Sequence, residues 1–327
     1  MKARSIDKEE NRHNNLINFI INEKIHLLLG ALVVTLFWAA LLQNKIDMLS
    51  LVVIICSYFS VMQINRYTDI EEDRINIPDA LHSALKNRSI ILFLIMLSFA
   101  VSLVLALVGG IQSLIYLLLM YLLGICYSFN IRFKKTKIMR VKQIFLLKNI
   151  IPTLVWAFAV IIYPIVFSRL RIDFGDLLIF FYVLSIIFIA DVSLDIKDVK
   201  GDLAAGVPTL PVKYGILATK KILKSVNLIS GIVILSLLLI PYSNKFPSLH
   251  SYLSYFFIAL WIAGSILFMS YYINNINKSK LFGADILFLI SPFVYIIGYF
   301  WFKLYLILMM KIYLILKVLF FMAKRQI

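Results

Sequence analysis

The chain has 327 residues, of which 62% are apolar and only 15% are charged. Soluble globular proteins are typically about 45–50% apolar and about 25% charged, so this composition excludes an ordinary water-soluble enzyme. Lysine and arginine outnumber aspartate and glutamate by 33 to 17, a formal net charge of +16. In so apolar a chain, basic loops on one side of a membrane explain this excess better than nucleic-acid binding does.

Apolar runs follow a polar N-terminal arm at residues 1–24. A helix needs roughly 20 mainly apolar residues to cross a bilayer, and nine runs approach or exceed this length: residues 25–42, 48–64, 89–108, 111–129, 150–167, 174–194, 226–241, 252–272 and 281–302. The segment 303–327 forms either a tenth span or an amphipathic helix in the interface, because its lysines 303, 311 and 317 share one side of a helix. We therefore predict an all-α membrane protein with a nine-helix domain at 25–302.

The distribution of basic residues orients these predicted spans. If the N-terminal arm is cytoplasmic, the arm and the loops on the cytoplasmic side carry 24 lysines and arginines, whereas the opposite loops carry four. Membrane proteins concentrate basic residues on the cytoplasmic side. The N-terminus and the loops that follow even-numbered spans are therefore predicted to be cytoplasmic.

Acidic residues are concentrated in the same basic loops. Nine of the 17 lie in two short stretches, 69–79 and 191–202, each at the cytoplasmic end of an even-numbered span. A spacing of three or four residues would place each set on one face of a helix. The two sets are Asn65, Asp69 and Asp73 in the first stretch, and Asp191, Asp195, Asp198 and Asp202 in the second.

A row of carboxylates at the end of a membrane span needs a cation to offset its repulsion and desolvation. Mg²⁺ takes oxygen ligands, commonly one or two carboxylates with waters and substrate phosphates. Two facing rows would therefore hold Mg²⁺ ions that bind a diphosphate between them, with the seven residues above as ligands. The alternative is a pair of solvated helix ends, which explains most charge runs but not the repeated helical spacing.

At these residues the sequence resembles the UbiA superfamily of intramembrane prenyltransferases. Residues 65–76 are similar to the first Asp-rich motif of that family, and residues 194–215 to the second motif and its tail. Tyr127, Ser128 and the basic residues after them are similar to the stretch that follows the family's fourth helix. The resemblance implies a helical bundle around a central cavity, in which the Asp motifs hold a polyprenyl diphosphate through Mg²⁺.

The resemblance also implies the reaction and the residues that perform it. The diphosphate leaves, an allylic carbocation forms, and a lipophilic acceptor, an aromatic ring or quinone precursor, attacks it. Catalytic roles are expected for Asp69, Asp73, Asp195 and Tyr127, the last through its ring, although a tyrosine at a membrane interface is usually an aromatic-belt residue. Diphosphate contacts are expected from five basic residues: Arg66, Arg132, Lys134, Lys135 and Lys148.

The sequence departs from the family after the first motif. Residues 78–84, Pro-Asp-Ala-Leu-His-Ser-Ala, lack the Arg-Pro pair and the glycine of the family's Arg-Pro-Leu-x-x-Gly segment. This keeps open a membrane terpene cyclase, which uses the same ionisation without an acceptor. A many-span transporter is a further alternative, but it predicts acids near the midplane on broken helices, whereas these acids lie at span ends.

Overall fold

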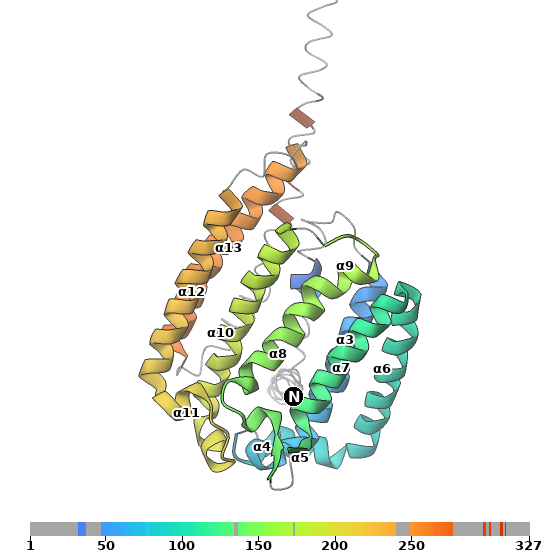
Figure 1. The fold of residues 1–327 in the computed structure, drawn as a ribbon, viewed down its shortest axis with the longest axis vertical. Coiled ribbons are helices and arrows are strands. Elements are labelled where there is room, and N and C mark those ends of the chain that lie inside the picture. The colour runs from blue at the N-terminus through green and yellow to red at the C-terminus, as the bar shows by residue number, and fades with distance from the viewer. Residues whose placement is uncertain are drawn as a thin grey trace, which may run out of the picture.

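The computed structural model describes residues 32–36, 47–76, 78–133, 137–172, 174–239 and 249–276, with 297–298, 301, 308–309 and 311. The long helices are α3 (Met48–Thr68), α6 (Arg88–Gly109), α7 (Ile111–Ser128), α8 (Leu147–Ala157), α10 (Phe174–Ala204), α12 (Ile216–Leu239) and α13 (Leu249–Asn275). They run alongside one another, and the short helices α4 (Ile70–Asn76), α5 (Pro78–Lys86) and α11 (Leu210–Tyr214) gather at one end of the bundle (Figure 1).

The described part of the chain is almost wholly helical, as the composition predicts. Its strands form one antiparallel hairpin of β1 (Asn130–Phe133) and β2 (Lys137–Arg140), which the all-α prediction did not contain. The hairpin lies in the basic loop after α7 and leads into a short 3-10 helix, η3 (Val141–Gln143). It is a local feature of a loop and leaves the helical architecture unchanged.

Six helical segments within the described residues are long and apolar enough to cross a membrane: Met48–Thr68, Arg88–Gly109, Ile111–Ser128, Leu147–Phe167, Phe174–Ala204 and Phe256–Asn275. Helix α12 covers the predicted span 226–241 as far as Leu239. It begins earlier than predicted, at Ile216, so Lys220, Lys221 and Lys224 lie on the helix and not in a loop before it. The predicted arm 1–24, spans 25–42 and 281–302 and segment 303–327 lie wholly or largely outside the described residues, so the count of nine stays a prediction.

Glycine 110 makes the turn between α6 and α7. Its backbone φ is +104°, a value that residues with a Cβ rarely adopt. Its backbone N–H donates to the Leu107 carbonyl at 3.0 Å. The two helices are consecutive and packed together, and much of α6 faces outward, with Phe93 64% and Met96 72% exposed. This apolar outer surface is the one expected to face lipid.

The predicted span 150–167 is helical throughout, but its turns are not uniform. Between α8 and α9 (Tyr163–Phe167) lies a π-helical turn, η4 (Phe158–Ile162), whose last four side chains are buried. Pro164 has no N–H for the carbonyl four residues earlier, and just before it the Tyr163 N–H donates to the Phe158 carbonyl, five residues earlier. The Ser113 hydroxyl then ties this segment to α7 by donating to the Tyr163 hydroxyl at 2.9 Å.

Buried hydrogen bonds also hold the bundle together. Lipid tails are as apolar as the side chains, so helices in a bilayer associate through close packing and interhelical hydrogen bonds. Ser102 and Tyr121 share a 2.7 Å hydrogen bond between α6 and α7, and the Asn227 amide of α12 donates to the Ile266 carbonyl of α13 at 2.9 Å. These contacts position the outer helices around the inner ones.

Helix α10 is longer than a membrane requires. Its 31 residues span about 46 Å at about 1.5 Å per residue, against a hydrocarbon core of about 30 Å. The predicted span ends at residue 194, and the helix continues unbroken to Ala204. The turns that carry the second acidic stretch therefore extend toward the end of the bundle where α4, α5 and α11 lie (Figure 1).

Candidate active site

A cavity of about 370 Å³ lies between α3, α4, α7, α8 and α10. Both acidic stretches line it, although they are far apart in the sequence. All seven residues expected to bind metal are among its lining residues: Asn65, Asp69, Asp73, Asp191, Asp195, Asp198 and Asp202. The structure thus brings the two stretches to one site, and their role there remains a prediction.

The first stretch is not the continuous helix that its spacing suggests. Helix α3 ends at Thr68, and Asp69, with φ −107° and ψ 24°, separates it from α4. The Thr68 hydroxyl donates to the Asn65 carbonyl at 2.8 Å, a local hydrogen bond of the kind that competes with a regular helix. The expectation of one unbroken helix is therefore wrong, but Asn65, Asp69 and Asp73 still line the same cavity.

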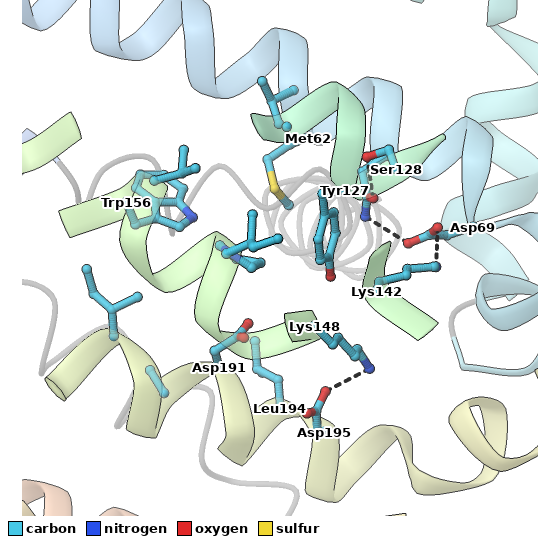
Figure 2. Close-up of a pocket in the computed structure, with 18 of the residues that line it drawn as sticks. Met62, Asp69, Tyr127, Ser128, Lys142, Lys148, Trp156, Asp191, Leu194 and Asp195 are labelled. Atoms are coloured by element: carbon cyan, nitrogen blue, oxygen red, sulfur yellow. Dashed lines mark hydrogen bonds and ion pairs between the residues drawn. The ribbon is translucent and has the colours of Figure 1, made fainter. Parts of the chain in front are cut away.

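Asn65 holds Asp69 from one side. Its amide donates to Asp69 Oδ2 at 2.8 Å, and its own carbonyl oxygen accepts from the Ser128 hydroxyl at 3.0 Å. This chain of contacts runs from α7 through α3 to the first carboxylate (Figure 2). Asn65 therefore acts here as a hydrogen-bonding support for Asp69.

Lys142 neutralises the same carboxylate from the other side. It lies on η3, its side chain is only 3% exposed, and its ammonium contacts Asp69 and sits 2.7 Å from Glu72 Oε1. Neither Lys142 nor Glu72 stands out in the sequence as a site residue. Glu72 falls outside the four-residue spacing, and Lys142 is one basic residue among many in its loop, so only the fold distinguishes them.

The second stretch lies on one face of α10, as predicted. Lys148 of α8 contacts Asp195 at 2.8 Å and Asp202 at 2.7 Å. The neighbouring Asn149, which is 1% exposed, donates its amide to Asp191 at 3.0 Å and to Asp195 at 2.8 Å. One turn of α8 therefore organises three carboxylates of α10, and Asn149 is a further site residue to which sequence reasoning gave no role.

A close approach of α4 to α10 holds the two stretches beside each other. A Cβ at Gly201 would lie 2.5 Å from both side-chain polar atoms of Asn76. Real side-chain atoms do not approach so closely, so only glycine allows Asn76 to pack there. Gly201 immediately precedes Asp202, and Asn76 lines the cavity with Asp73. The packing of two short segments thus sets the separation of the two carboxylate groups.

The other predicted site residues have different placements. Tyr127 lines the cavity beside the Asp69–Lys142 pair, with its hydroxyl pointing toward Lys148 (Figure 2), and Arg66 also lines the cavity. Arg132 lies in β1, opposite Ile138 in the hairpin register. Lys134 and Lys135 lie outside the described residues. Of the expected diphosphate contacts, the structure therefore places Arg66 and Lys148 at the cavity.

The rest of the cavity wall is apolar and aromatic. Val155 and Trp156 of α8 and Val183 and Ile186 of α10 are among its lining residues. The ring of Tyr58 packs on Trp156, with their centroids 4.3 Å apart. The cavity therefore has charged groups at one end and apolar walls along the remainder, which suits a molecule with an anionic head and a hydrocarbon tail.

The donor set at the charged end fits a divalent cation such as Mg²⁺. Carboxylate and amide oxygens are the ligands that Mg²⁺ and Mn²⁺ prefer. Among the described residues, no three acidic, histidine or cysteine side chains are grouped closely enough to hold a metal ion. Lys142 and Lys148 instead lie between the carboxylates, so those oxygens have ammonium partners in this structure.

The model of the UbiA prenyltransferase family matches residues 27–291, and so covers most of the chain. The chain belongs to this family. Membership confirms the resemblance found from the acidic motifs and supports prenyltransferase activity in general. Together with the six apolar helices, it makes this UbiA family member an integral membrane protein.

Solved structures of UbiA proteins share the fold. A UbiA homologue from Archaeoglobus fulgidus matches with a TM-score of 0.62 and 15% identity, over 86% of this chain and 98% of its own. The same homologue bound to GPP and Mg²⁺ matches with a TM-score of 0.60 and 16% identity, over 85% and 99%. A digeranylgeranylglyceryl phosphate synthase matches with a TM-score of 0.54 and 21% identity, over 88% and 99%. No curated protein matches by sequence.

Proposed function

We propose that this UbiA family member transfers a polyprenyl group from its diphosphate to a lipophilic acceptor, an aromatic ring or quinone precursor, in a Mg²⁺-dependent reaction. The observation that carries the proposal is the polarity of the cavity, with two carboxylate groups and two lysines at one end and apolar walls along the rest. A similar fold bound to GPP and Mg²⁺ supports the assignment.

The cavity suits each part of a prenyl diphosphate. The diphosphate would lie at the charged end, where Asp69, Asp73 and Asp195 would hold Mg²⁺. When bound there, Mg²⁺ would neutralise charge that develops on the diphosphate as it leaves. The prenyl tail would lie along Trp156 and the aliphatic side chains, which keep water away from a reactive carbocation.

The chain's own residues would assist the bond changes. The C1–O bond of the allylic diphosphate breaks, and its electron pair leaves with the diphosphate. The acceptor then forms a bond to C1 and loses a proton. Arg66, Lys142 and Lys148 would stabilise the negative charge on the leaving group, while the ring of Tyr127 would face the positive charge on the prenyl group.

The first test replaces one carboxylate in each stretch. Asp69→Asn and Asp195→Asn should each lower Mg²⁺-dependent release of diphosphate from a prenyl diphosphate by about 100-fold or more, because a preorganised electrostatic contact is lost. The measurement is diphosphate release by the purified protein in detergent. Asp176→Asn is a matched control, because Asp176 is also buried on α10 but does not line the cavity. Full activity in both site variants would contradict the proposal.

Product analysis distinguishes prenyl transfer from cyclisation. With a prenyl diphosphate and no acceptor, a transferase should release no cyclic product, and addition of a phenolic or hydroquinone acceptor should give a prenylated ring. A cyclic hydrocarbon or alcohol formed without an acceptor would instead identify a terpene cyclase that uses the same site. Flux of substrate across proteoliposomes without diphosphate release would identify a transporter.

A further inference from the structure

In each of the two acidic stretches, a lysine from another segment of the chain contacts two of the carboxylates. Lys142 contacts Asp69 and Glu72, and Lys148 contacts Asp195 and Asp202. Each ammonium thus bridges two carboxylates, and Asp69, Asp195 and Asp202 among them are expected ligands of the divalent cation. The same arrangement occurs twice, in two acidic segments that are far apart in the sequence.

The physical reason for this pairing is the cost of burying like charges together. Glu72, Asp195 and Asp202 are at most 5% exposed, and two buried carboxylates side by side repel each other strongly. Removing one partner of a buried ion pair is costly because it leaves an uncompensated charge. A cation beside each pair offsets this repulsion, and Lys142 and Lys148 supply it in this structure.

We propose that Lys142 and Lys148 are built-in counter-ions that couple the binding of the divalent cation to the binding of the diphosphate donor. The proposal rests on the function proposed above. Each ammonium leaves its carboxylates when a divalent cation takes them, and its flexible four-carbon stem lets it reach the phosphate oxygens of the donor. A cation that binds alone displaces the ammoniums without giving them a new partner, whereas a cation that binds with the donor supplies one.

Two binding constants test this coupling. Lys142→Met and Lys148→Met remove the charge and keep a long side chain. Binding of Mn²⁺ alone, followed by electron paramagnetic resonance, should become about 5-fold tighter or more in each variant, because no ammonium competes for the carboxylates. Binding of labelled inorganic pyrophosphate at saturating Mg²⁺ should become about 5-fold weaker or more, because the phosphates lose their ammonium partner.

The opposite signs of the two changes identify the role. Replacing a lysine that only stabilises the fold would weaken the binding of both Mn²⁺ and pyrophosphate. Replacing a lysine that only contacts phosphate would leave Mn²⁺ binding unchanged. Lys220→Met is the matched control, because the Lys220 ammonium contacts the Asn274 carbonyl and does not line the cavity. It should leave both constants unchanged. Lys142→Gln and Lys148→Gln replace the methionine variants if these do not fold, because an amide still donates to one carboxylate.

Equal or weaker Mn²⁺ binding in folded variants of both lysines would overturn the counter-ion proposal and leave the proposed function intact. Failure of the unaltered protein to bind Mn²⁺ and pyrophosphate together would instead contradict the proposed function itself. The two failures are therefore separable in one set of measurements, and neither requires a known acceptor.

Discussion

Asn149 holds two carboxylates of the second acidic stretch with a single amide group. Its Nδ2 atom donates to Asp191 at 3.0 Å and to Asp195 at 2.8 Å, in a setting where Asn149 is 1% exposed. A neutral amide does not cancel the repulsion between these groups, but it fixes where their oxygens point. At this depth, a carboxylate that loses its donor also loses the hydrogen bond that compensates for its burial.

Asn149→Ala is therefore expected to lower the turnover number for diphosphate release by about 10-fold, because misoriented carboxylates stabilise the reaction less well. Steady-state kinetics with a prenyl diphosphate measure the effect. Asn149→Asp should be worse than Asn149→Ala, since it places a third carboxylate beside Asp191 and Asp195. A turnover number equal to that of the unaltered protein in Asn149→Ala would rule out this positioning role.

Two elements, α4 and α10, determine how far apart the carboxylate groups lie. The two helices pack tightly at Asn76 and Gly201, where a Cβ on Gly201 would come within 2.5 Å of the Asn76 amide. Asn76 is at the end of α4 and Gly201 is near the end of α10, each within a turn of an acidic residue. A change in side-chain volume at this contact therefore shifts one carboxylate group relative to the other.

Gly201→Ala should force Asn76 away from α10, with a destabilisation of about 1–3 kcal/mol as for other overpacked contacts and a loss of activity of about 10-fold. Thermal unfolding and diphosphate release measure the two effects. The double variant Gly201→Ala with Asn76→Ala should unfold at a higher temperature than Gly201→Ala alone, because the added methyl group then has space. Without such a recovery, the contact would not be the cause of the loss.

In the whole molecule, α4, α5 and α11 lie together at one end of the bundle (Figure 1), and α4 carries the cavity-lining residues Glu72 and Asp73. The lysines of α12 and the basic hairpin are in loops or helix ends that the charge distribution assigns to the same side. We propose that this end faces the cytoplasm, since basic residues concentrate there. The diphosphate head of the substrate would then lie toward the aqueous cytoplasm, and its prenyl tail would lie within the bilayer.

Cysteine labelling tests the orientation. With Cys56 and Cys126 changed to serine, a cysteine placed at Lys200 should react with a membrane-impermeant maleimide only after the cells are permeabilised. A cysteine placed at Arg171, in the loop between α9 and α10, should react in intact cells. Labelling of the Lys200 position in intact cells would reverse the proposed topology.

Much of the architecture and part of the site follow from the sequence alone. The hydrophobicity of each run predicts a membrane helix, because only a helix satisfies its own backbone groups in lipid. The spacing of Asp191, Asp195, Asp198 and Asp202 predicts their common face on α10, because that segment is one regular helix. Asn65, Asp69 and Asp73 do not share one unbroken helix, since Thr68 ends α3, although all three line the cavity.

The remaining site residues depend on contacts between segments that are distant in the sequence. Lys142 meets Asp69 across 73 positions, and Asn149 meets Asp195 across 46. Periodicity and spacing compare near neighbours in the chain and so do not reveal these contacts. Glu72 lies beside the first motif, but its importance appears only when Lys142 packs against it. Periodicity and hydropathy are properties of neighbouring residues and determine the helices, whereas the pairing of each carboxylate with its lysine is decided only when the helices pack.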